Sequence, residues 1–229
     1  MASDPQPGAA EPSGSFQSSR ASAVIVVLLS LAAGMTDALC LLHLGGVFAS
    51  VVTGNLVLVA VSTVHGVADP AARAAISTGA YAAGVFAGSR MVARRSPAAR
   101  PPTCLALETL VLGLFVAGWL GDPHRSNGEG HPALLLAAGA AMGLQGIVVR
   151  TLGRPGLSTT YLTGALTRIV STIGDPSWLR RLDWLQLLAL GCLVLGAAVE
   201  AVLMRYLPWT GPLPAAVLAT AALLIAYRQ

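Results

Sequence analysis

The stretch GMTDALCLLHLGGVFASVVTGN, residues 34–55, places an aspartate and an asparagine inside an otherwise apolar part of the chain. No charged residue lies between Arg20 and Asp37, and Asn55 begins a further apolar run. A carboxylate is costly inside lipid, so it requires a partner, a proton or water. The stretch therefore raises two linked questions: whether these runs cross a membrane, and what Asp37 contacts there.

The composition indicates an integral membrane protein. Of the 229 residues, 55% are hydrophobic and 10% are charged, whereas a soluble domain is about 25% charged. The net charge of +4 comes from arginines that lie mostly in loops between apolar runs, as expected of a membrane protein. Because no soluble basic domain is present, we expect the lipid bilayer, and no nucleic acid, as the partner.

The cysteines and histidines form no ligand pattern. Cys40, Cys104 and Cys192 lie singly in three apolar segments, without a CxxC motif, and are interpreted as small buried residues. The four histidines are scattered along the chain. We therefore expect no metal site and no cofactor.

The chain divides into a tail and one membrane domain. Residues 1–20 are rich in Pro, Gly, Ser and Ala, which predicts a disordered N-terminal tail. Residues 21–229 are then a single helical membrane domain. Hydropathy marks eight apolar segments within it, at residues 23–44, 47–66, 72–92, 103–121, 132–151, 156–174, 184–206 and 212–227.

Each apolar segment is predicted to be a helix, because lipid-exposed backbone must satisfy its own hydrogen bonds. One helix needs about 20 residues to cross a bilayer, so the second, sixth and eighth segments are marginal. The fold class predicted is an all-α polytopic membrane protein with six full spans plus two short or re-entrant segments. Seven or eight spans are the alternatives.

An internal repeat divides the segments into two halves, residues 21–121 and 132–229. Leu44-Gly45 of the first half matches Leu152-Gly153 of the second, and Thr53-Gly54 matches Thr163-Gly164 after a two-residue insertion. Asp37 then corresponds to Gln145. Duplicated halves are frequent among transporters.

Arginine placement favours the six-span topology. If all eight segments cross, the arginines of the loops and tails split seven to six between the two sides. If segments two and six instead enter and leave on one side, with both termini in the cytoplasm, ten arginines lie inside and three outside. That split fits the positive-inside rule better, and three spans per half would invert the second half. Seven spans give nine to four and stay open.

The most polar membrane segment is the sixth, residues 156–174. Thr160, Gly164, Thr167 and Ser171 are spaced four, three and four residues apart, which places them on one helical face, and Arg168 borders it. Such a stripe either faces a polar cavity or joins helices through Ser/Thr hydrogen bonds. For Asp37, candidate partners are Arg168, the hydroxyls of Thr53 and Thr163, or a cation, and a buried structural pair is the alternative to a functional carboxylate.

The candidate site gathers polar residues of both halves, and glycines near them are candidates for close helix approach or bending. Glu108 is interpreted as interfacial, and Glu200 as a local pair with Arg205 or as a functional group. The predicted site residues are Asp37, Asn55, Gln145, Thr160, Thr163 and Arg168, and the structural glycines are Gly34, Gly54, Gly143 and Gly164.

The chain resembles the YoaK-like family, a group of uncharacterised bacterial inner-membrane proteins defined by a domain of unknown function. The resemblance rests on GMTDAL and LGGVFASVVTGN in the first half and on GLQGIVVRTLGRPGLSTTYLTGALTR in the second. One departure is Gly146, where the family usually has Asn. The resemblance implies a helical inner-membrane protein with about six spans, and it implies no activity.

Three functions are compatible with these patterns. The first is a transporter or channel for a small solute or ion with Asp37 as the coupling or binding carboxylate. The second is a membrane scaffold or assembly partner whose polar residues only pack helices, and the third is an intramembrane enzyme acting on lipid. No nucleophile–base motif such as GxSxG or HExxH is present, so we expect no catalysis. The sequence leaves a homo-oligomer open.

Overall fold

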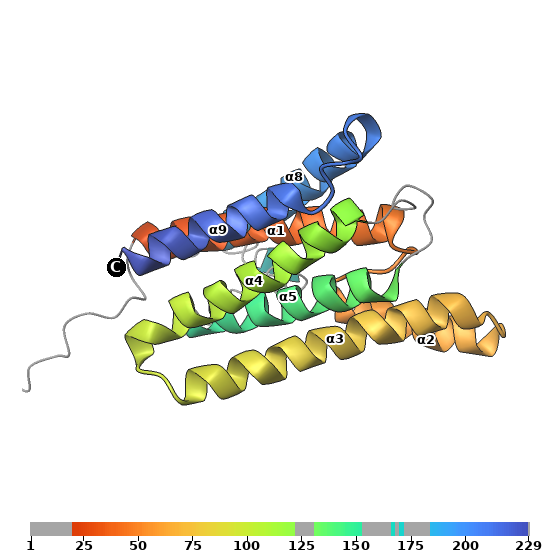
Figure 1. The fold of residues 1–229 in the computed structure, drawn as a ribbon, viewed down its shortest axis with the longest axis horizontal. Coiled ribbons are helices and arrows are strands. Elements are labelled where there is room, and N and C mark those ends of the chain that lie inside the picture. The colour runs from red at the N-terminus through yellow and green to blue at the C-terminus, as the bar shows by residue number, and fades with distance from the viewer. Residues whose placement is uncertain (1–19, 122–130, 153–165, 168–169, 172–183, 229) are drawn as a thin grey trace, which may run out of the picture.

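A computed structural model describes residues 20–121, 131–152, 166–167, 170–171 and 184–228 (Figure 1). Every regular element within these ranges is helical. The elements are α1 (Arg20–His43), α2 (Val52–Val64), α3 (Ala68–Ala93), the short 3-10 helix η2 (Pro97–Ala99), α4 (Arg100–Gly121), α5 (Pro132–Thr151), α8 (Trp184–Tyr206) and α9 (Leu213–Tyr227).

These helices match seven of the eight predicted apolar segments to within a few residues, apart from the start of the second. The second apolar run begins at residue 47, but residues 47–51 are not helical, so α2 begins only at Val52. The predicted sixth segment, residues 156–174, lies almost wholly outside the described residues, as does the predicted tail up to residue 19. The prediction of an all-α fold is confirmed for the described part.

The helices have the length and the surface of membrane spans. α1, α4, α5 and α8 are each long and apolar enough to cross a bilayer, whereas α2 and α9 are apolar but have 13 and 15 residues. Val194 and Leu195 on α8 are more than half exposed, as lipid-facing side chains are expected to be. The chain is a multi-pass membrane protein.

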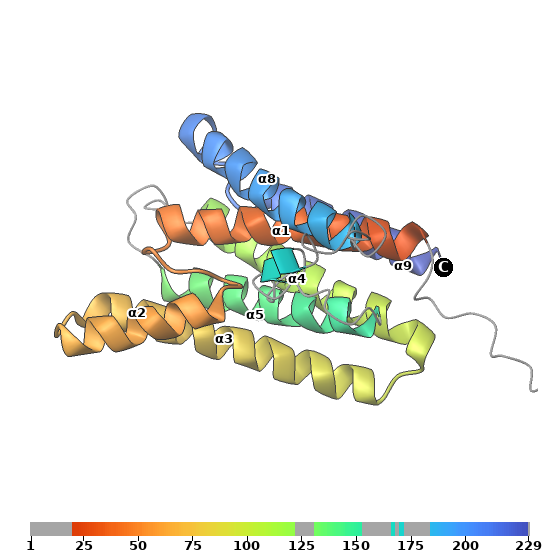
Figure 2. The ribbon, with the colours of Figure 1, turned by 180° about the vertical axis from the view of Figure 1, so that it is seen from behind.

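The described helices form two parallel pairs that run in opposite directions (Figures 1 and 2). α1 packs beside α8, and both point towards the same end of the molecule. α3 packs beside α5, and both point towards the other end. α9 contacts α1, α4 contacts α5, and α4 and α9 contact each other, which joins the two pairs into one bundle.

Glycines bring the helices of the first pair into backbone contact. A Cβ at Gly34 of α1 would collide with the carbonyl oxygen of Leu193 in α8. A Cβ at Gly196 of α8 would collide with the carbonyl oxygen of Leu31 in α1. The role predicted for Gly34 in close packing follows directly from this contact.

The second pair uses the same device. A Cβ at Gly84 of α3 would collide with the carbonyl oxygen of Ala140, and one at Gly143 of α5 with that of Tyr81. Gly143, predicted as a structural glycine, is therefore required for α3 and α5 to approach this closely.

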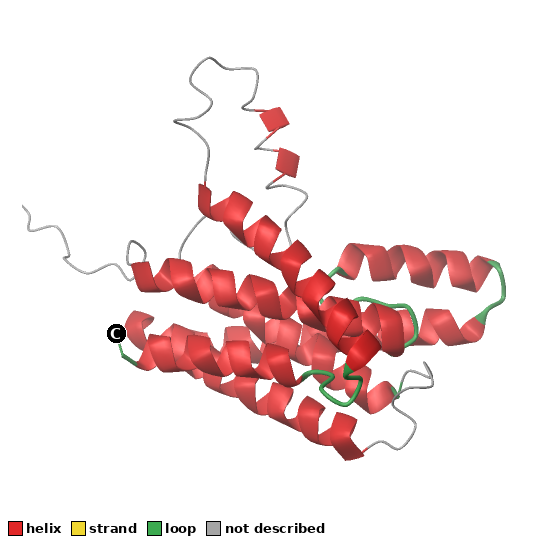
Figure 3. Ribbon diagram, turned by 90° about the horizontal axis from the view of Figure 1, so that it is seen from above, coloured by secondary structure: helices red, strands yellow, loops and turns green. Residues whose placement is uncertain are grey.

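The chain between α1 and α2 turns back towards the middle of the bundle. After His43 it runs without helical structure through residues 44–51, drawn as a loop in Figure 3, and α2 then returns towards the end at which α1 finished. The α2–α3 hairpin extends beyond the other helices at that end. α2 therefore begins inside the bundle and ends at the end where α1 finishes.

The described arginines are concentrated at one end of the bundle. Only Arg73 and Arg205 among them lie at the end where α1 finishes. At the opposite end lie Arg20, Arg90, Arg94, Arg95, Arg100, Arg150 and Arg228.

Candidate functional site

Two glycines make the reversal after α1 possible. Gly45 and Gly46 have φ values of +90° and +76°, a region that residues with a Cβ rarely adopt. A Cβ at Gly45 would also collide with the side chain of Arg73, which packs over the turn from α3. The turn directs residues 47–51 back along α1.

Asp37 fixes the returning segment to α1. Its Oδ1 accepts hydrogen bonds from the backbone N–H groups of Ala49 and Ser50, both at 2.8 Å, and its Oδ2 accepts one from the Ser50 hydroxyl at 2.5 Å. Asp37 lies six residues before the last residue of α1, His43. Because a helix rises about 1.5 Å per residue, Ser50 is held about 9 Å inside that end.

Asn55 provides hydrogen-bond partners for the backbone of Phe48, the residue before Ala49. Its Oδ1 accepts a hydrogen bond from the N–H of Phe48 at 3.0 Å, and its Nδ2 donates to the Phe48 carbonyl at 2.6 Å. The Ser77 hydroxyl of α3 donates to the same carbonyl at 2.6 Å. Asn55 and Ser77 are buried.

The polar side chains of three helices thus replace the hydrogen bonds that a helix would supply. Non-helical backbone inside a membrane is tolerated where it is buried in protein or lines a cavity, since each unsatisfied group costs several kcal/mol in lipid. Asp37 from α1, Asn55 from α2 and Ser77 from α3 together hold residues 48–50. We name these residues, with their three side chains, the central element.

The first turn of α2 follows the central element. Val51 occupies the N-cap position and supplies no side-chain hydrogen bond to the turn. Thr53 is exposed, and a Cβ at Gly54 would meet Val51 at 3.4 Å, an ordinary contact. Gly54 is therefore not required by packing in the described structure, unlike Gly34 and Gly143.

Gln145 of α5 is fully buried and reaches the first half of the chain. Its Nε2 donates a hydrogen bond to the carbonyl of Leu29 in α1 at 2.9 Å. Its Oε1 has no hydrogen-bond partner among the described residues. Gln145 therefore connects the two helix pairs and keeps one acceptor available near their centre.

These motifs place the chain in a family. The family model described as "Protein of unknown function (DUF1275)" matches residues 25–226, from the second turn of α1 to the last turn of α9. The chain belongs to the DUF1275 family. It is similar to "UPF0700 transmembrane protein YoaK" of Bacillus subtilis (strain 168), at 28% identity over 160 residues that cover 69% of each chain. No solved structure matches this DUF1275 protein.

The family resemblance is explained in part by the central element. The GMTDAL motif supplies Asp37 and the TGN motif supplies Asn55, both of which bond to backbone. At Gly146, where this DUF1275 protein departs from the resemblance, a Cβ would meet the Tyr81 hydroxyl at 3.0 Å. The Tyr81 hydroxyl therefore occupies space that the side chain of a larger residue at position 146 would need.

Half of the predicted site lies outside the described residues. Thr160, Thr163, Arg168 and the glycine at Gly164 belong to that part, so a pairing of Asp37 with Arg168 or Thr163 stays a prediction. The other three predicted site residues are described, and they lie in two separate places. Asp37 and Asn55 meet at the central element, and Gln145 bonds to Leu29.

Two buried carboxyl groups change the interpretation made from the sequence. Glu108 of α4 is fully buried and Glu200 of α8 is 1% exposed, and their carboxyl oxygens have no hydrogen-bond partner among the described residues. Glu108, interpreted from the sequence as interfacial, is buried because its face of α4 points into the bundle. Arg205 lies over the ring of Tyr206 at 5.7 Å, and Glu200 accepts no hydrogen bond from it.

The spacing along α4 contained the signal for Glu108. Cys104, Leu112, Phe115 and Trp119 recur at helical spacing with it, and all are buried. An ionisable group on such a stripe faces the bundle interior. Among the described residues, no three His, Cys, Asp or Glu side chains gather as metal ligands.

Proposed function

We propose that this membrane protein binds and passes a small solute or ion at a polar site beside the first turn of α2. The observation that carries the proposal is the central element, in which non-helical backbone is held deep in the bundle by buried polar side chains. Transporter sites are typically formed where membrane helices are interrupted near the bilayer midplane. The interruption at residues 44–51 supports such a site here.

The proposal gives the polar residues distinct roles. Asp37 and Asn55 use their hydrogen-bonding atoms on the backbone of residues 48–50, so they hold the first turn of α2 in place. Thr53, which is exposed at that turn, is the described side chain best placed to contact a solute. Gln145, whose Oε1 has no hydrogen-bond partner among the described residues, is placed on the other helix pair.

We further propose that two inverted halves build the site. Under the sequence repeat, α1 corresponds to α5, α3 to α8 and α4 to α9. Corresponding helices run in opposite directions, and corresponding contacts recur: α1 packs on α8 and α9, and α5 packs on α3 and α4. The sequence counterpart of the interrupted segment in the second half contains Thr160, Thr163 and Arg168, which lie outside the described residues.

The arginine distribution supports an orientation. Seven described arginines lie at the end where α1 begins and two at the other end. By the positive-inside rule the first end faces the cytoplasm. We therefore propose a bacterial inner-membrane protein with both termini in the cytoplasm, and with α2 as a re-entrant helix that opens towards the outer side.

Water access to Thr53 tests the proposed site. Thr53→Cys would be placed in a chain whose three native cysteines are alanine, and its reaction with a membrane-impermeant thiol reagent would be measured in membrane vesicles. The control is Leu195→Cys, which is exposed on α8 near the Gly196 crossing and faces lipid under the proposal. A thiol reacts as the thiolate, so we expect Thr53→Cys to react at least about tenfold faster.

A membrane scaffold that transports nothing is the second candidate function. It is favoured by the observation that Asp37 accepts three hydrogen bonds from groups within the protein. It predicts that Thr53→Cys is as unreactive as Leu195→Cys, and that result would contradict the transport proposal. If Thr53→Cys does react, a panel of small solutes should protect it from the reagent, which identifies the class transported. The proposal assigns the chain no catalytic activity.

A further inference from the structure

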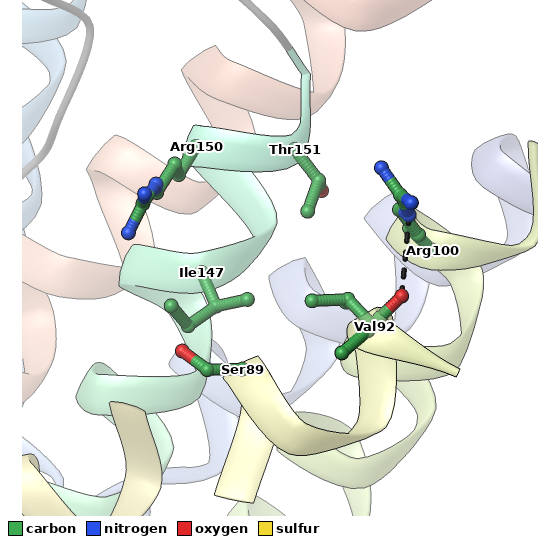
Figure 4. Close-up of a pocket in the computed structure, with 7 residues that line it drawn as sticks. Ser89, Val92, Arg100, Ile147, Arg150 and Thr151 are labelled. Carbon is green, nitrogen blue, oxygen red and sulfur yellow. Dashed lines mark hydrogen bonds between the residues drawn. The ribbon is translucent and has the colours of Figure 1, made fainter. Parts of the chain in front are cut away.

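A pocket opens at the arginine-rich end of the bundle, where α3 ends, α4 begins and α5 ends (Figure 4). Its volume is about 470 Å³. It is separate from the central element, because Ser89 of its lining is twelve residues, about 18 Å, along α3 from Ser77. The described residues that line the pocket are Ser89, Val92, Ala93, Arg100, Ile147, Arg150 and Thr151.

One of the two lining arginines is held in place by the helix that precedes it. Nε of Arg100 donates hydrogen bonds to the carbonyl of Val92 at 3.2 Å and to that of Arg95 at 3.3 Å. These bonds engage Nε, and the other guanidinium nitrogens extend on the Thr151 side of the pocket (Figure 4). The guanidinium is therefore positioned before any ligand arrives.

The second arginine stands on the other side of the pocket. Arg150 lies in the last turn of α5, is exposed, and is separated from Arg100 by the side chains of Ile147 and Val92 (Figure 4). The two arginines therefore line one pocket from different helices, with the Arg150 guanidinium on the side away from Thr151 (Figure 4).

No carboxylate of the surrounding helices neutralises these charges. α3, α4 and α5 together carry two acidic residues. Asp69 is at the far end of α3, and Glu108 is fully buried two turns along α4 from Arg100. The described lining is thus positively charged and contains no acid.

We propose that this pocket binds a phosphate group. Guanidinium groups match the oxygens of phosphate with paired, charge-assisted hydrogen bonds, and the Ser89 hydroxyl adds a polar group to the same wall. Val92, Ala93 and Ile147 provide an apolar surface next to the charges. Basic pockets between membrane helices bind anionic lipid headgroups, so the phosphate belongs either to a phospholipid or to a soluble phosphate compound.

Binding would be measured on the purified full-length protein. One arm uses nanodiscs of phosphatidylcholine with increasing phosphatidylglycerol, and the other uses inorganic phosphate and glycerol 3-phosphate added to phosphatidylcholine nanodiscs. The readouts are the shift in the thermal unfolding midpoint and bound lipid counted by native mass spectrometry. We expect phosphatidylglycerol or the soluble phosphates to raise the midpoint in a saturable manner.

Variants identify the pocket. Arg150→Gln and Arg100→Gln should each weaken the apparent affinity by about fivefold to tenfold, the loss of one charge-assisted contact. Arg90→Gln is the matched control, because Arg90 is at the same end of α3 but lies over the Phe86 ring at 5.0 Å. It should change the affinity by less than about twofold.

Each outcome decides the proposal. Loss of affinity in Arg150→Gln with phosphatidylglycerol alone identifies a lipid headgroup, and loss with the soluble phosphates identifies a soluble ligand. If Arg100→Gln unfolds because its bonds to Val92 and Arg95 are lost, the exposed Arg150 still carries the test. Equal affinity in Arg150→Gln and Arg90→Gln, or no effect of any phosphate compound, overturns the proposal.

Discussion

At the scale of single residues, buried polar side chains in this protein bond to backbone more than to one another. Asp37, Asn55, Ser77 and Gln145 all have backbone partners, and three of them act on residues 48–50. Such bonds are valuable in lipid because the alternative is an unsatisfied backbone group. This pattern explains why an apolar chain retains an aspartate within its first helix.

A replacement of Asp37 should therefore be tolerated if it keeps a hydrogen-bond acceptor and not if it lacks one. Asp37→Asn keeps an oxygen for the N–H groups of Ala49 and Ser50, and its amide can donate to the Ser50 hydroxyl, so we expect a loss of about 1 kcal/mol in unfolding free energy. Asp37→Ala leaves both N–H groups without an acceptor and should cost about 3–5 kcal/mol.

Unfolding in detergent by titrated denaturant measures both Asp37 variants. Thr36→Ala is the control, because Thr36 is equally buried and its hydroxyl bonds only to the carbonyl of Ala32 in its own helix. It should cost less than about 1.5 kcal/mol. Equal losses in Asp37→Asn and Asp37→Ala would show that the charge of Asp37, and not its hydrogen bonds, is what the fold requires.

At Asn55, unlike at Asp37, an exchange between amide and carboxylate should be poorly tolerated. Its side chain both accepts from and donates to Phe48, so Asn55→Asp turns the donor into an acceptor that faces a carbonyl oxygen. We expect Asn55→Asp to lose about 2–4 kcal/mol, at least as much as Asn55→Ala. The same unfolding measurement checks this order, and an Asn55→Asp protein as stable as wild type would refute the assigned bonds.

Glu108 is buried without a hydrogen-bond partner in the described structure. Glu108→Gln should therefore change the unfolding free energy by less than about 1.5 kcal/mol, because no described bond is lost and the shape is kept. Glu108→Ala should cost about 2–4 kcal/mol through the cavity it leaves. A large loss of stability in Glu108→Gln would contradict this expectation and show that the carboxyl group makes a bond that the amide cannot replace.

The residues of the central element show what sequence can and cannot reveal. Asp37 and Asn55 stand out because polar residues are rare in apolar runs, so their importance was predictable. Their partners were not, because a side chain that bonds to backbone seven to thirteen positions away across a turn leaves no trace in residue spacing. Ser77 was missed altogether, since a serine in a helix is ordinarily explained by local packing.

At the scale of helices, glycine position determines which pairs form. The α8 sequence has glycines at Gly191 and Gly196, and the sequence alone does not distinguish them. In the structure Gly196 meets the backbone of α1, whereas a Cβ at Gly191 would meet no atom within 4 Å. Helix bounds follow from hydropathy, but the choice of partner depends on which glycine faces which helix.

These two glycines give a matched test of the α1–α8 contact. Gly196→Ala should destabilise the protein by at least about 2 kcal/mol, because the added methyl collides with the Leu31 carbonyl. Gly191→Ala should be neutral or stabilising by up to about 1 kcal/mol, since alanine favours helix more than glycine does. Thermal unfolding of both variants checks the difference, and equal stability would place the contact elsewhere.

At the scale of the whole molecule, the path of α2 determines how many spans the chain has. α2 has 13 residues and so a length of about 20 Å, short of the 30 Å hydrocarbon core. Asp37 holds its start inside the bundle, and α3 begins at the end where α2 finishes. Both observations agree with a helix that enters and leaves on one side, the path that arginine placement favoured in the sequence although the run at residues 47–66 is apolar enough to span.

Single cysteines at three exposed positions test this path. His65 lies between α2 and α3, Ser96 between α3 and α4, and Leu207 follows α8 at the same end of the bundle as His65. We expect His65→Cys and Leu207→Cys to react with an impermeant thiol reagent from the outer side, and Ser96→Cys from the cytoplasmic side. If α2 crossed the bilayer, His65 would be cytoplasmic and Ser96 external, so that His65→Cys and Ser96→Cys would each react from the side opposite to the one expected here. That result would remove the re-entrant helix and with it the inverted relation between the two halves.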